Sequence, residues 1–538
     1  MANVGRVLIV GPALFICCAK TPPKVVPENP VIVEEVRLEG FDVLPVDVRE
    51  DLPGDLPLRA GIALTEDVEK AGGERAVEIL QNHGYPYAQV GIAREPIDSS
   101  RTRVIVRADP GTVGFFGPVD IAGNRRVDDR IIRRRLAYAP GDLFRRGAIE
   151  QTQQRIGAIG LFKSVEIRVL NIDNRPAVVP TLITVEEDTP WKWNLGLGYA
   201  AGDRLGVDAR ISHLNVFGAA ERIDLQGRVS KIERTAELSY TQTDAWHPAL
   251  SLALQARHQE IDERAFFVMS RGGQAAVGWQ WTDEFSTTGS YAVSLERSDV
   301  DAALDPLLGL RDGMLSAWAL DLEHRRLAAS AAGFGESRRS AQDADAQRRD
   351  TPVRTMSLHV EQAGGWMPGT FNYFSVAGDA RHYLRAFDER VVFASRLRLG
   401  SIDPMGGDAD VPLLKRFFLG GSNDMRAWGT YELSPLSASG EPVGGKSLLT
   451  ATAEVRVPLL KRLRGAVFVE AGNVWLDPWT MRLGDLRYDI GPGLRFDTPF
   501  GLLRVDFGYQ LRPLDGLRLD GKPQTSRWRI NFGIGEAF

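Results

Sequence analysis

The sequence is almost without cysteine and has no long apolar run. Its two cysteines, Cys17 and Cys18, are adjacent near the start, and the rest of the chain has none. A disulfide framework and a cysteine-based metal site are therefore excluded beyond that point. No run of about 18 apolar residues occurs, which is the length that an α-helix needs to cross a bilayer. We therefore expect no membrane-spanning helix.

Motifs of common enzyme sites are also missing. The sequence has no Gly-x-Ser-x-Gly, no His-Glu-x-x-His and no glycine-rich phosphate loop. The seven histidines lack the spacing of metal ligands; they are His83, His213, His247, His258, His324, His359 and His382. We expect no catalytic residue, no metal site, no cofactor and no enzymatic activity. With a net charge of −5 and a pI near 5.9, a nucleic-acid partner is not expected either.

Residues 1–19 have the pattern of an export signal. Arg6 precedes a short apolar run that ends near Ala19, which is typical of secreted proteins. Cys18, followed by a polar proline-rich stretch, is a candidate for lipidation, and cleavage after Ala19 is the alternative. Residues 20–30 contain four prolines and no periodicity, so we expect an extended tether.

One order of elements occurs twice between residues 31 and 188. In the first copy, residues 31–111, strand and helix patterns lie at 31–40, 66–83, 89–95 and 102–108. In the second, residues 112–188, they lie at 119–123, 128–136, 147–159, 164–170 and 181–187. A fixed order that returns after about 80 residues predicts two copies of one α+β module with the order βααββ.

From residue 189 to 538 the helical period gives way to alternation of apolar and polar residues. Trp191, Trp193 and Leu195 alternate with Lys192 and Asn194, for example. About sixteen such segments follow one another, whereas a soluble sandwich is usually near 100 residues long. The expected fold is therefore mainly β, with a transmembrane antiparallel barrel whose apolar face meets lipid.

One stretch fits this strand count poorly. Counted back from the C-terminus, the polar residues 328–350 fall on the periplasmic side, where the turns of such barrels are short. Either the chain carries an insertion there, or the count is wrong by one strand in the middle of the barrel.

Three features resemble the BamA/TamA-type outer-membrane insertase superfamily, with the TamA-like members nearest. The βααββ modules resemble POTRA domains, and residues 417–429 (FFLGGSNDMRAWG) resemble the signature of the sixth loop. Residues 491–501 and 532–538 resemble the last strands and the barrel-targeting signal. The resemblance covers nearly all of residues 31–538 and implies a barrel in the outer membrane with its POTRA arm in the periplasm.

The resemblance also implies a salt bridge in the barrel lumen. The family signature is Arg-Gly-aromatic; Arg426 and Trp428 match it, while Ala427 replaces the glycine, which bears on the tightness of the turn. The stretch that matches the acidic partner contains Glu470. A loop of about 45 residues, 401–445, is too long for a passive hairpin, and the family folds it back into the lumen. The alternative is a solvated arginine and an unrelated glutamate.

The first and last strands must pair, because an open edge in lipid leaves backbone groups unsatisfied. We expect this lateral seam to involve six residues: Trp191, Trp193, Leu195, Phe532, Ile534 and Phe538. Glycines in both strands would weaken the pairing, because they add no cross-strand side-chain contact. Alternatively, these glycines make room for the loop.

The function that the resemblance implies is insertion or assembly of outer-membrane proteins through POTRA client binding and the seam. The alternative is a two-partner-secretion-type transporter, which exports a client through its lumen; such transporters usually carry a plug helix, for which residues 20–30 leave no room. A passive porin fits the modules poorly.

Expected partners are unfolded outer-membrane or secreted clients, a periplasmic or inner-membrane partner of the arm, and outer-membrane lipid near the basic second module. That module carries Arg125, Arg126, Arg130, Arg133, Arg134, Arg135, Arg145 and Arg146. The alternative is that these arginines form a solvated helix face.

Overall fold

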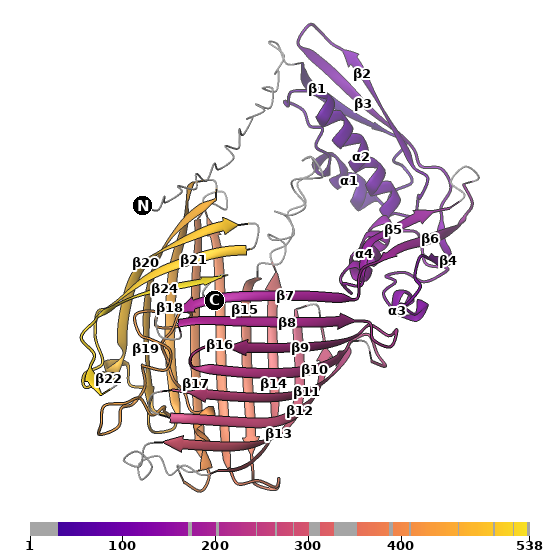
Figure 1. Ribbon diagram of the computed structural model, residues 1–538. Coiled ribbons are helices and arrows are strands. Elements are labelled where there is room, and N and C mark those ends of the chain that lie inside the picture. Colours follow the sequence, from indigo (N-terminus) through magenta and orange to yellow (C-terminus); the bar gives the residue numbers. More distant parts are fainter. Residues whose placement is uncertain are drawn as a thin grey trace, which may run out of the picture. The chain divides into compact units, whose positions relative to one another are not determined.

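The computed structural model describes most of the chain beyond residue 30 (Figure 1). The described residues are 31–170, 175–200, 204–243, 245–263, 266–282, 284–300, 312–327, 352–386, 391–407, 410–460, 462–498, 501–519 and 521–534. The export signal with Cys18, the tether, the polar stretch 328–350 and Phe538 lie outside them. Among the described helices, none combines the length and apolar composition needed to cross a bilayer.

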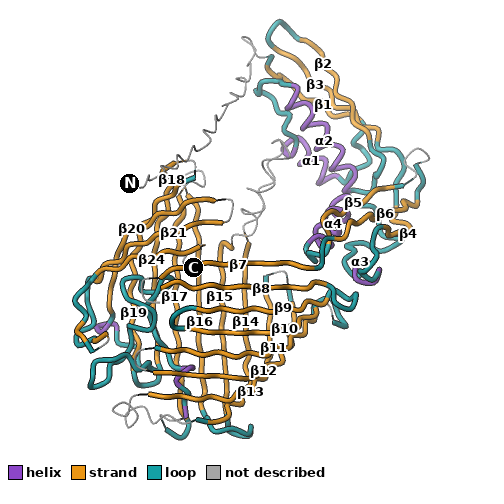
Figure 2. Tube along the Cα trace, in the orientation of Figure 1, coloured by secondary structure: helices purple, strands orange, loops and turns teal. Residues whose placement is uncertain are grey.

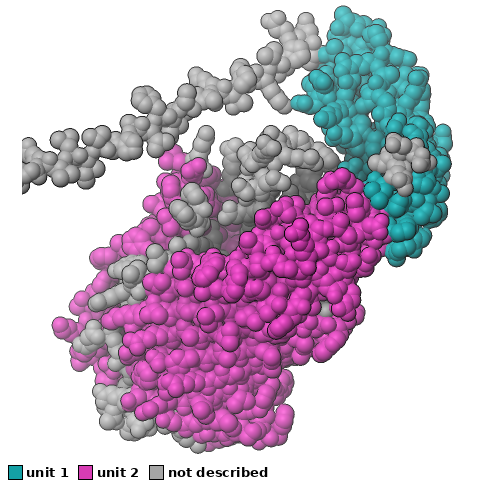
Figure 3. All heavy atoms as spheres, turned by 45° about the vertical axis from the view of Figure 1, so that its right-hand side comes forward, with its two compact units in different colours: residues 1–118, 139–147, 169–180 teal, residues 119–138, 148–168, 181–538 magenta. Residues whose placement is uncertain are grey.

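The chain divides into two compact units, and the division runs through the second repeat (Figure 3). The first unit comprises residues 1–118, 139–147 and 169–180, and the second comprises residues 119–138, 148–168 and 181–538. The four α-helices all belong to the two repeats, whereas the long strands beyond residue 190 form one sheet (Figure 2).

The first repeat forms a βααββ module whose helices share a core with a three-stranded sheet. Its elements are β1 (Ile32–Glu39), α1 (Val46–Asp55), α2 (Glu66–Asn82), β2 (Gln89–Pro96) and β3 (Arg101–Asp109). The sheet order is β1-β3-β2, with β1 parallel and β2 antiparallel to β3. Helix α2 begins where the Thr65 side chain accepts a hydrogen bond from the Val68 N–H and acidic residues occupy the first turn. Its buried face, including Ala76 and Leu80, packs against Val104 and Val106 of β3.

The second repeat has the same order and the same kind of sheet. Its elements are β4 (Phe115–Ala122), α3 (Asp129–Arg133), α4 (Arg146–Gly157), β5 (Phe162–Val169) and β6 (Val178–Glu187), in the sheet order β4-β6-β5. Asp128 caps α3 by accepting from the Arg130 N–H at 2.8 Å. At the end of β6, burial opposes ionisation of Glu187, but the backbone N–H groups of residues 125–127 donate to its carboxylate and hold its pKa below the usual range.

Sixteen antiparallel strands close into a barrel, which confirms the expected fold class. In chain order they are β7 (Trp191–Ala200), β8 (Arg204–Leu214), β9 (Glu221–Val229), β10 (Glu233–Gln242), β11 (Leu250–Asp262), β12 (Phe266–Gln280), β13 (Phe285–Val300), β14 (Gly313–Leu327), β15 (Pro352–Ala363), β16 (Tyr373–Ala386), β17 (Val391–Pro404), β18 (Ser447–Leu460), β19 (Leu463–Trp475), β20 (Arg487–Thr498), β21 (Gly501–Gln510) and β24 (Trp528–Ile534). The short strands β22 (Arg518–Leu519) and β23 (Lys522–Pro523) form a separate hairpin, and β24 lies next to β7.

The strand order answers the question that residues 328–350 raised. Because neighbouring strands alternate in direction, the β14–β15 connection lies at the same end of the barrel as the β8–β9 turn. The number of strands is sixteen, and no strand was missed in the middle of the barrel. A miscount of the strands therefore does not explain the misfit of residues 328–350, which lie outside the described residues.

Burial in the barrel is reversed relative to a soluble protein. In β21, Val505 is 36% exposed, whereas the charged Asp506 beside it is fully buried. The same alternation in β19 exposes Val467 and Val469 and buries Glu470. An exposed apolar band around a charged interior is unfavourable in water and favourable in a bilayer, which solvates the apolar face. The burial pattern therefore agrees with a transmembrane barrel.

Each module turns sharply after its first strand at a glycine that touches the central strand. Gly40 has φ +83° and Gly123 has φ +92°, a conformation that other residues adopt at a cost. A Cβ atom at Gly40 would lie 2.2 Å from the Ala108 carbonyl oxygen, and one at Gly123 would lie 2.0 Å from that of Val185. The two repeats therefore share one backbone constraint at equivalent positions.

This constraint predicts that Gly40→Ala and Gly123→Ala each destabilise their module by about 2–4 kcal/mol, through strain and overpacking. Urea unfolding of the detergent-solubilised protein, followed by the helical circular dichroism signal of α1–α4, measures the change. Gly91→Ala is the matched control, because a Cβ atom there meets nothing within 4 Å. Equal stability of all three variants would contradict the assignment.

Candidate functional site in the barrel lumen

The loop between β17 and β18 has a core of its own. Backbone bridges join Phe417 to Gly445 and Leu419 to Leu433, so the segment folds back on itself. Trp428 is completely buried and packs with Met425 and other apolar side chains of the loop, and with residues of β18 and β19. A long loop with internal hydrogen bonds and a packed core holds a defined conformation, and it carries the candidate arginine into the barrel.

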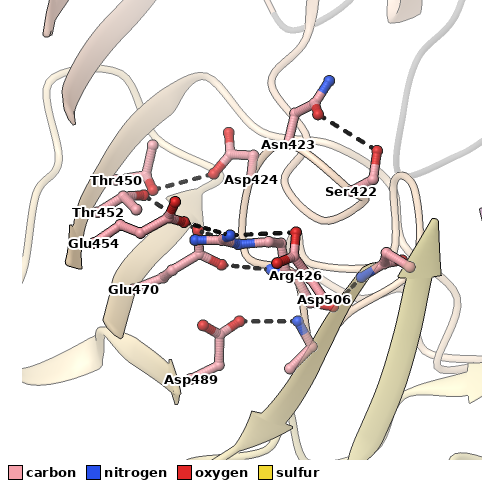
Figure 4. A network of polar contacts seen from close by, with 12 residues as sticks. Ser422, Asn423, Asp424, Arg426, Thr450, Thr452, Glu454, Glu470, Asp489 and Asp506 are labelled. Atoms are coloured by element: carbon pink, nitrogen blue, oxygen red, sulfur yellow. Dashed lines mark hydrogen bonds and ion pairs between the residues drawn. The ribbon is translucent and has the colours of Figure 1, made fainter. Parts of the chain in front are cut away.

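Arg426 lies at the centre of a cluster of carboxylates (Figure 4). Its backbone N–H donates to Glu470 Oε2 at 2.6 Å and its Nε to Glu470 Oε1 at 3.2 Å. Its Nη1 donates to Glu454 Oε2 at 2.7 Å and lies 3.4 Å from Asp506 Oδ2. The guanidinium carbon is 3.4 Å from the centroid of the Phe468 ring. The structure therefore brings Arg426 and Glu470 together and adds two acidic partners.

A second arginine shares these acidic partners. Arg495 Nη1 donates to Asp506 at 2.6 Å, and its Nη2 donates to Glu454 at 3.2 Å. All three side chains are fully buried. Buried charges are tolerated only when they are paired and hydrogen-bonded. The arginines and carboxylates of β18, β20, β21 and the loop therefore depend on one another, and loss of one removes a charged partner from each group that it contacts.

Sequence reasoning missed Glu454, Arg495 and Asp506. Alternation of apolar and polar residues in 503–509 places Arg504 and Asp506 on the polar face of β21. That signal indicated a charged lumen, but it gave no distances between strands. Which charges meet depends on the register of neighbouring strands and on where the loop descends.

Ala427 in place of glycine does not disturb the turn. Its N–H donates to Asp489 Oδ2 at 3.0 Å, and its carbonyl accepts from Gln510 Nε2 at 2.9 Å. The residue of this turn with positive φ is Met425, at +49°. The close approach depends on Gly508 of β21, where a Cβ atom would lie 2.8 Å from the Ala427 nitrogen. The glycine that permits the close approach therefore lies in the barrel wall, at Gly508, and not in the loop.

Three further ion pairs attach the loop to different parts of the wall. Asp424 pairs with Arg398 of β17 and accepts a hydrogen bond from Thr450 at 3.2 Å. Lys415 Nζ donates to Glu361 of β15 at 2.8 Å. The third pair joins Glu432 to Arg529 of β24 at 2.6 Å. The loop is therefore fixed to both early and late strands of the barrel, including the last strand.

The seam lies between β24 and β7, and the register of these strands indicates which residues face each other. Among the described residues, the register places Asn531 opposite Ala200. Because the strands are antiparallel, Phe532 then lies opposite residue 199, and Leu195 lies opposite residue 536, outside the described range. Trp191, Trp193 and Leu195 are exposed on β7 but do not face Phe532, which is exposed on β24. Ile534 ends β24. Alternation cannot fix the register of two strands so far apart in the chain.

Comparison with known proteins matches both parts of the chain. Residues 215–538 match the Omp85 superfamily domain, and residues 115–188 match the surface antigen variable number repeat, a POTRA family. The chain is 22% identical over 507 residues to outer membrane protein assembly factor BamA of Neorickettsia risticii, covering 91% of this chain and 64% of the relative. It is 20% identical over 512 residues to BamA of Neisseria meningitidis, covering 85% and 60%. The chain thus spans less than two thirds of the length of these relatives.

A solved structure shows the same fold. The crystal structure of BamA from Haemophilus ducreyi lacking POTRA domains 1–3 has a TM-score of 0.70 to this chain. It covers 94% of this chain and 99% of its own, at 16% identity. The likeness therefore extends over both the barrel and the repeats.

The charge cluster predicts unequal single-variant effects and a strongly non-additive double variant. Arg426→Ala leaves Glu470 without its arginine and removes one of the arginines that pair with Glu454 and Asp506, so it should destabilise the folded loop by about 3–5 kcal/mol. Glu470→Gln should cost less, because Glu454 and Asp506 still hold the arginine. The double variant should be little worse than Arg426→Ala alone. Thermal unfolding of the detergent-solubilised barrel, read by its shift in gel mobility, measures each effect. Additive losses would show that the two residues act independently.

Proposed function

The chain belongs to the Omp85 superfamily, and on that basis we propose that it is an outer-membrane assembly factor that inserts client proteins through its lateral seam. The observation that carries the proposal is the difference between the two edges of β24. It pairs with β21 along its whole length, from Leu503 with Ile534 to Tyr509 with Trp528. Towards β7, the described register is the single pair Asn531 and Ala200. In this described part of the seam, little backbone pairing has to be lost for the strands to part, and a parted seam offers a strand edge to a client.

A groove beside β24 supports access to that edge. Its volume is about 480 Å³, and it lies between β24 and the segment that carries the β22–β23 hairpin. The lining residues are Leu519, Lys522, Pro523, Gln524, Thr525, Ser526, Trp528, Arg529, Ile530 and Phe532. Strand addition requires an extended client segment beside a sheet edge. The groove leaves space for such a segment at the start of β24.

The proposed location is the outer membrane, with the two POTRA modules in the periplasm. The exposed apolar side chains of the barrel strands support the first part, because lipid is the solvent that favours them. The modules lie at the N-terminal side of the barrel sequence and offer client-binding sheets. A periplasmic or inner-membrane partner of this arm, and unfolded client proteins, are the partners that we propose. The mechanism has no catalytic step and needs no cofactor.

Lipid contact is proposed at the turn between β8 and β9. Phe217 is 76% exposed there. The turn is held to the second module, because Asn215 Nδ2 donates to the Arg126 carbonyl at 2.9 Å and the Asp128 N–H donates to the Gly218 carbonyl at 3.1 Å. The exposed Phe217 ring and the exposed Arg126 line one hollow, which fits the interface between lipid tails and phosphate headgroups.

Locking the seam separates insertion from export through the lumen. Cysteines at Tyr199 and Phe532, which the register places opposite each other, should form a disulfide in the otherwise cysteine-free barrel. We expect the oxidised protein to stay folded but to lose client insertion into liposomes by at least about tenfold, with recovery on reduction. A matched pair across a fully paired junction, at Leu195 and Ala209 of β7 and β8, should not reduce insertion. Full activity with a locked seam would favour the two-partner-secretion alternative.

The arm has its own test. Deletion of residues 31–110 should leave a barrel that still shows heat-modifiable gel mobility, because the barrel strands close without it. Client insertion by this variant should fall to background, since clients or partners would lack their binding sheets. The full-length protein purified in parallel is the control. Unchanged insertion would remove the arm from the proposed mechanism.

A further inference from the structure

The last strand of the barrel is held from the lumen by the loop. Arg529 Nη2 donates to Glu432 Oε2 at 2.6 Å, and Asn531 Nδ2 donates to the Arg426 carbonyl at 2.9 Å. Both donors belong to β24, and both acceptors belong to the β17–β18 loop. Alternation along β24 places these two side chains on the same face of the strand, inside the barrel. The loop therefore contacts β24 at two successive lumenal positions.

The ion pair between Glu432 and Arg529 is largely buried. Glu432 is 6% exposed and Arg529 is 16% exposed, so water competes little for the pair. The same Glu432 oxygen also accepts from the Gly429 N–H at 2.7 Å. A Cβ atom at Gly429 would lie 2.5 Å from Glu432 Oε1 and 2.9 Å from Arg529 Nη1. A side chain at residue 429 would therefore displace the ends of the Glu432 and Arg529 side chains.

Asn531 connects the loop to the seam directly. In the strand register, Asn531 of β24 pairs with Ala200 of β7, and its side chain donates a hydrogen bond to the carbonyl of Arg426. Arg426 is in turn fixed to Glu470 and Glu454 on β19 and β18. One residue of the last strand thus contacts both the neighbouring seam strand and the central arginine of the loop.

We propose that Glu432, with Arg529 and Asn531, forms a latch that sets how readily the seam parts. The latch keeps β24 beside β21 and in line with β7, and its release lets β24 move away from β7. The position of the loop and the opening of the seam are then one coupled equilibrium. The inference rests on the proposed function only in its consequence for clients; the coupling itself is a property of the barrel.

Asp424 provides a matched comparison. It belongs to the same loop and also forms an ion pair with a wall arginine, but that arginine, Arg398, lies on β17, away from the seam. Its loss loosens the loop without touching β24. A difference between variants of Glu432 and Asp424 therefore reports the latch, rather than general loosening of the loop.

The test measures seam opening in the full chain without a client. Nitroxide labels on cysteines at Leu195 and Phe532, both exposed on the outer face, report the separation of β7 and β24 in phosphatidylcholine–phosphatidylglycerol liposomes. Glu432→Gln keeps an acceptor for Gly429 but removes the charge. We expect it to raise the population of the long-distance state at least about tenfold, the size of effect expected for a hydrogen bond to a charged group. Arg529→Lys should stay near the parent, and Asp424→Asn should leave the distance distribution unchanged.

The outcomes separate the latch from the proposed function. An unchanged distribution in Glu432→Gln, or an equal change in Asp424→Asn, would overturn the latch. All variants must first show the heat-modifiable mobility of the folded barrel; a Glu432→Gln protein that fails this is replaced by Asn531→Ala, for which the same opening is expected. Client insertion is measured separately. If the seam opens as expected while no variant or parent inserts a client, the latch stands and the proposed function fails.

Discussion

The rest of the lumen depends on one buried cation, the guanidinium of Arg426. Three carboxylates from β18, β19 and β21 surround it, and Phe468 covers one face. Such a cluster is favourable only when it is complete, because each buried charge without its partner costs several kcal/mol. Completeness requires the loop to be inside the barrel. The arginine therefore determines where the loop lies, and the loop in turn occupies the lumen beside the last strands.

The two strands of the seam, β24 and β7, are held in place by different contacts. β24 is bound on one side by β21 and on its lumenal face by Glu432 and the Arg426 carbonyl. In the described residues, β7 is bound along its length to β8. In the part of the seam that the structure describes, Asn531 pairs with Ala200. Opening is then controlled by side chains inside the barrel, where they are shielded from water and ions.

The repeats and the barrel cover the apolar faces of their sheets in different ways. In the modules, helices cover one face of a small sheet, and a glycine allows the first strand to turn against the central one. In the barrel, closure leaves no free sheet edge and lipid covers the apolar face, so helices are not needed. The Haemophilus ducreyi BamA structure has the same fold over both parts of the chain.

The sequence by itself determined every feature that depends on local periodicity. Alternation gave the sixteen strands, and repetition gave the two modules, because both patterns are written within single elements. Helix α1 was not located from its own residues, since Pro53 and Gly54 weaken its pattern and Leu52 is its buried residue. The pairing of Arg426 with Glu470 came from family resemblance. Only the tertiary structure decided that Glu454 and Asp506 join them and that Phe532 faces residue 199. Those contacts depend on the register of neighbouring strands and on where the loop enters the lumen. Both bring together residues that are far apart in the chain, so the local sequence pattern does not predict them.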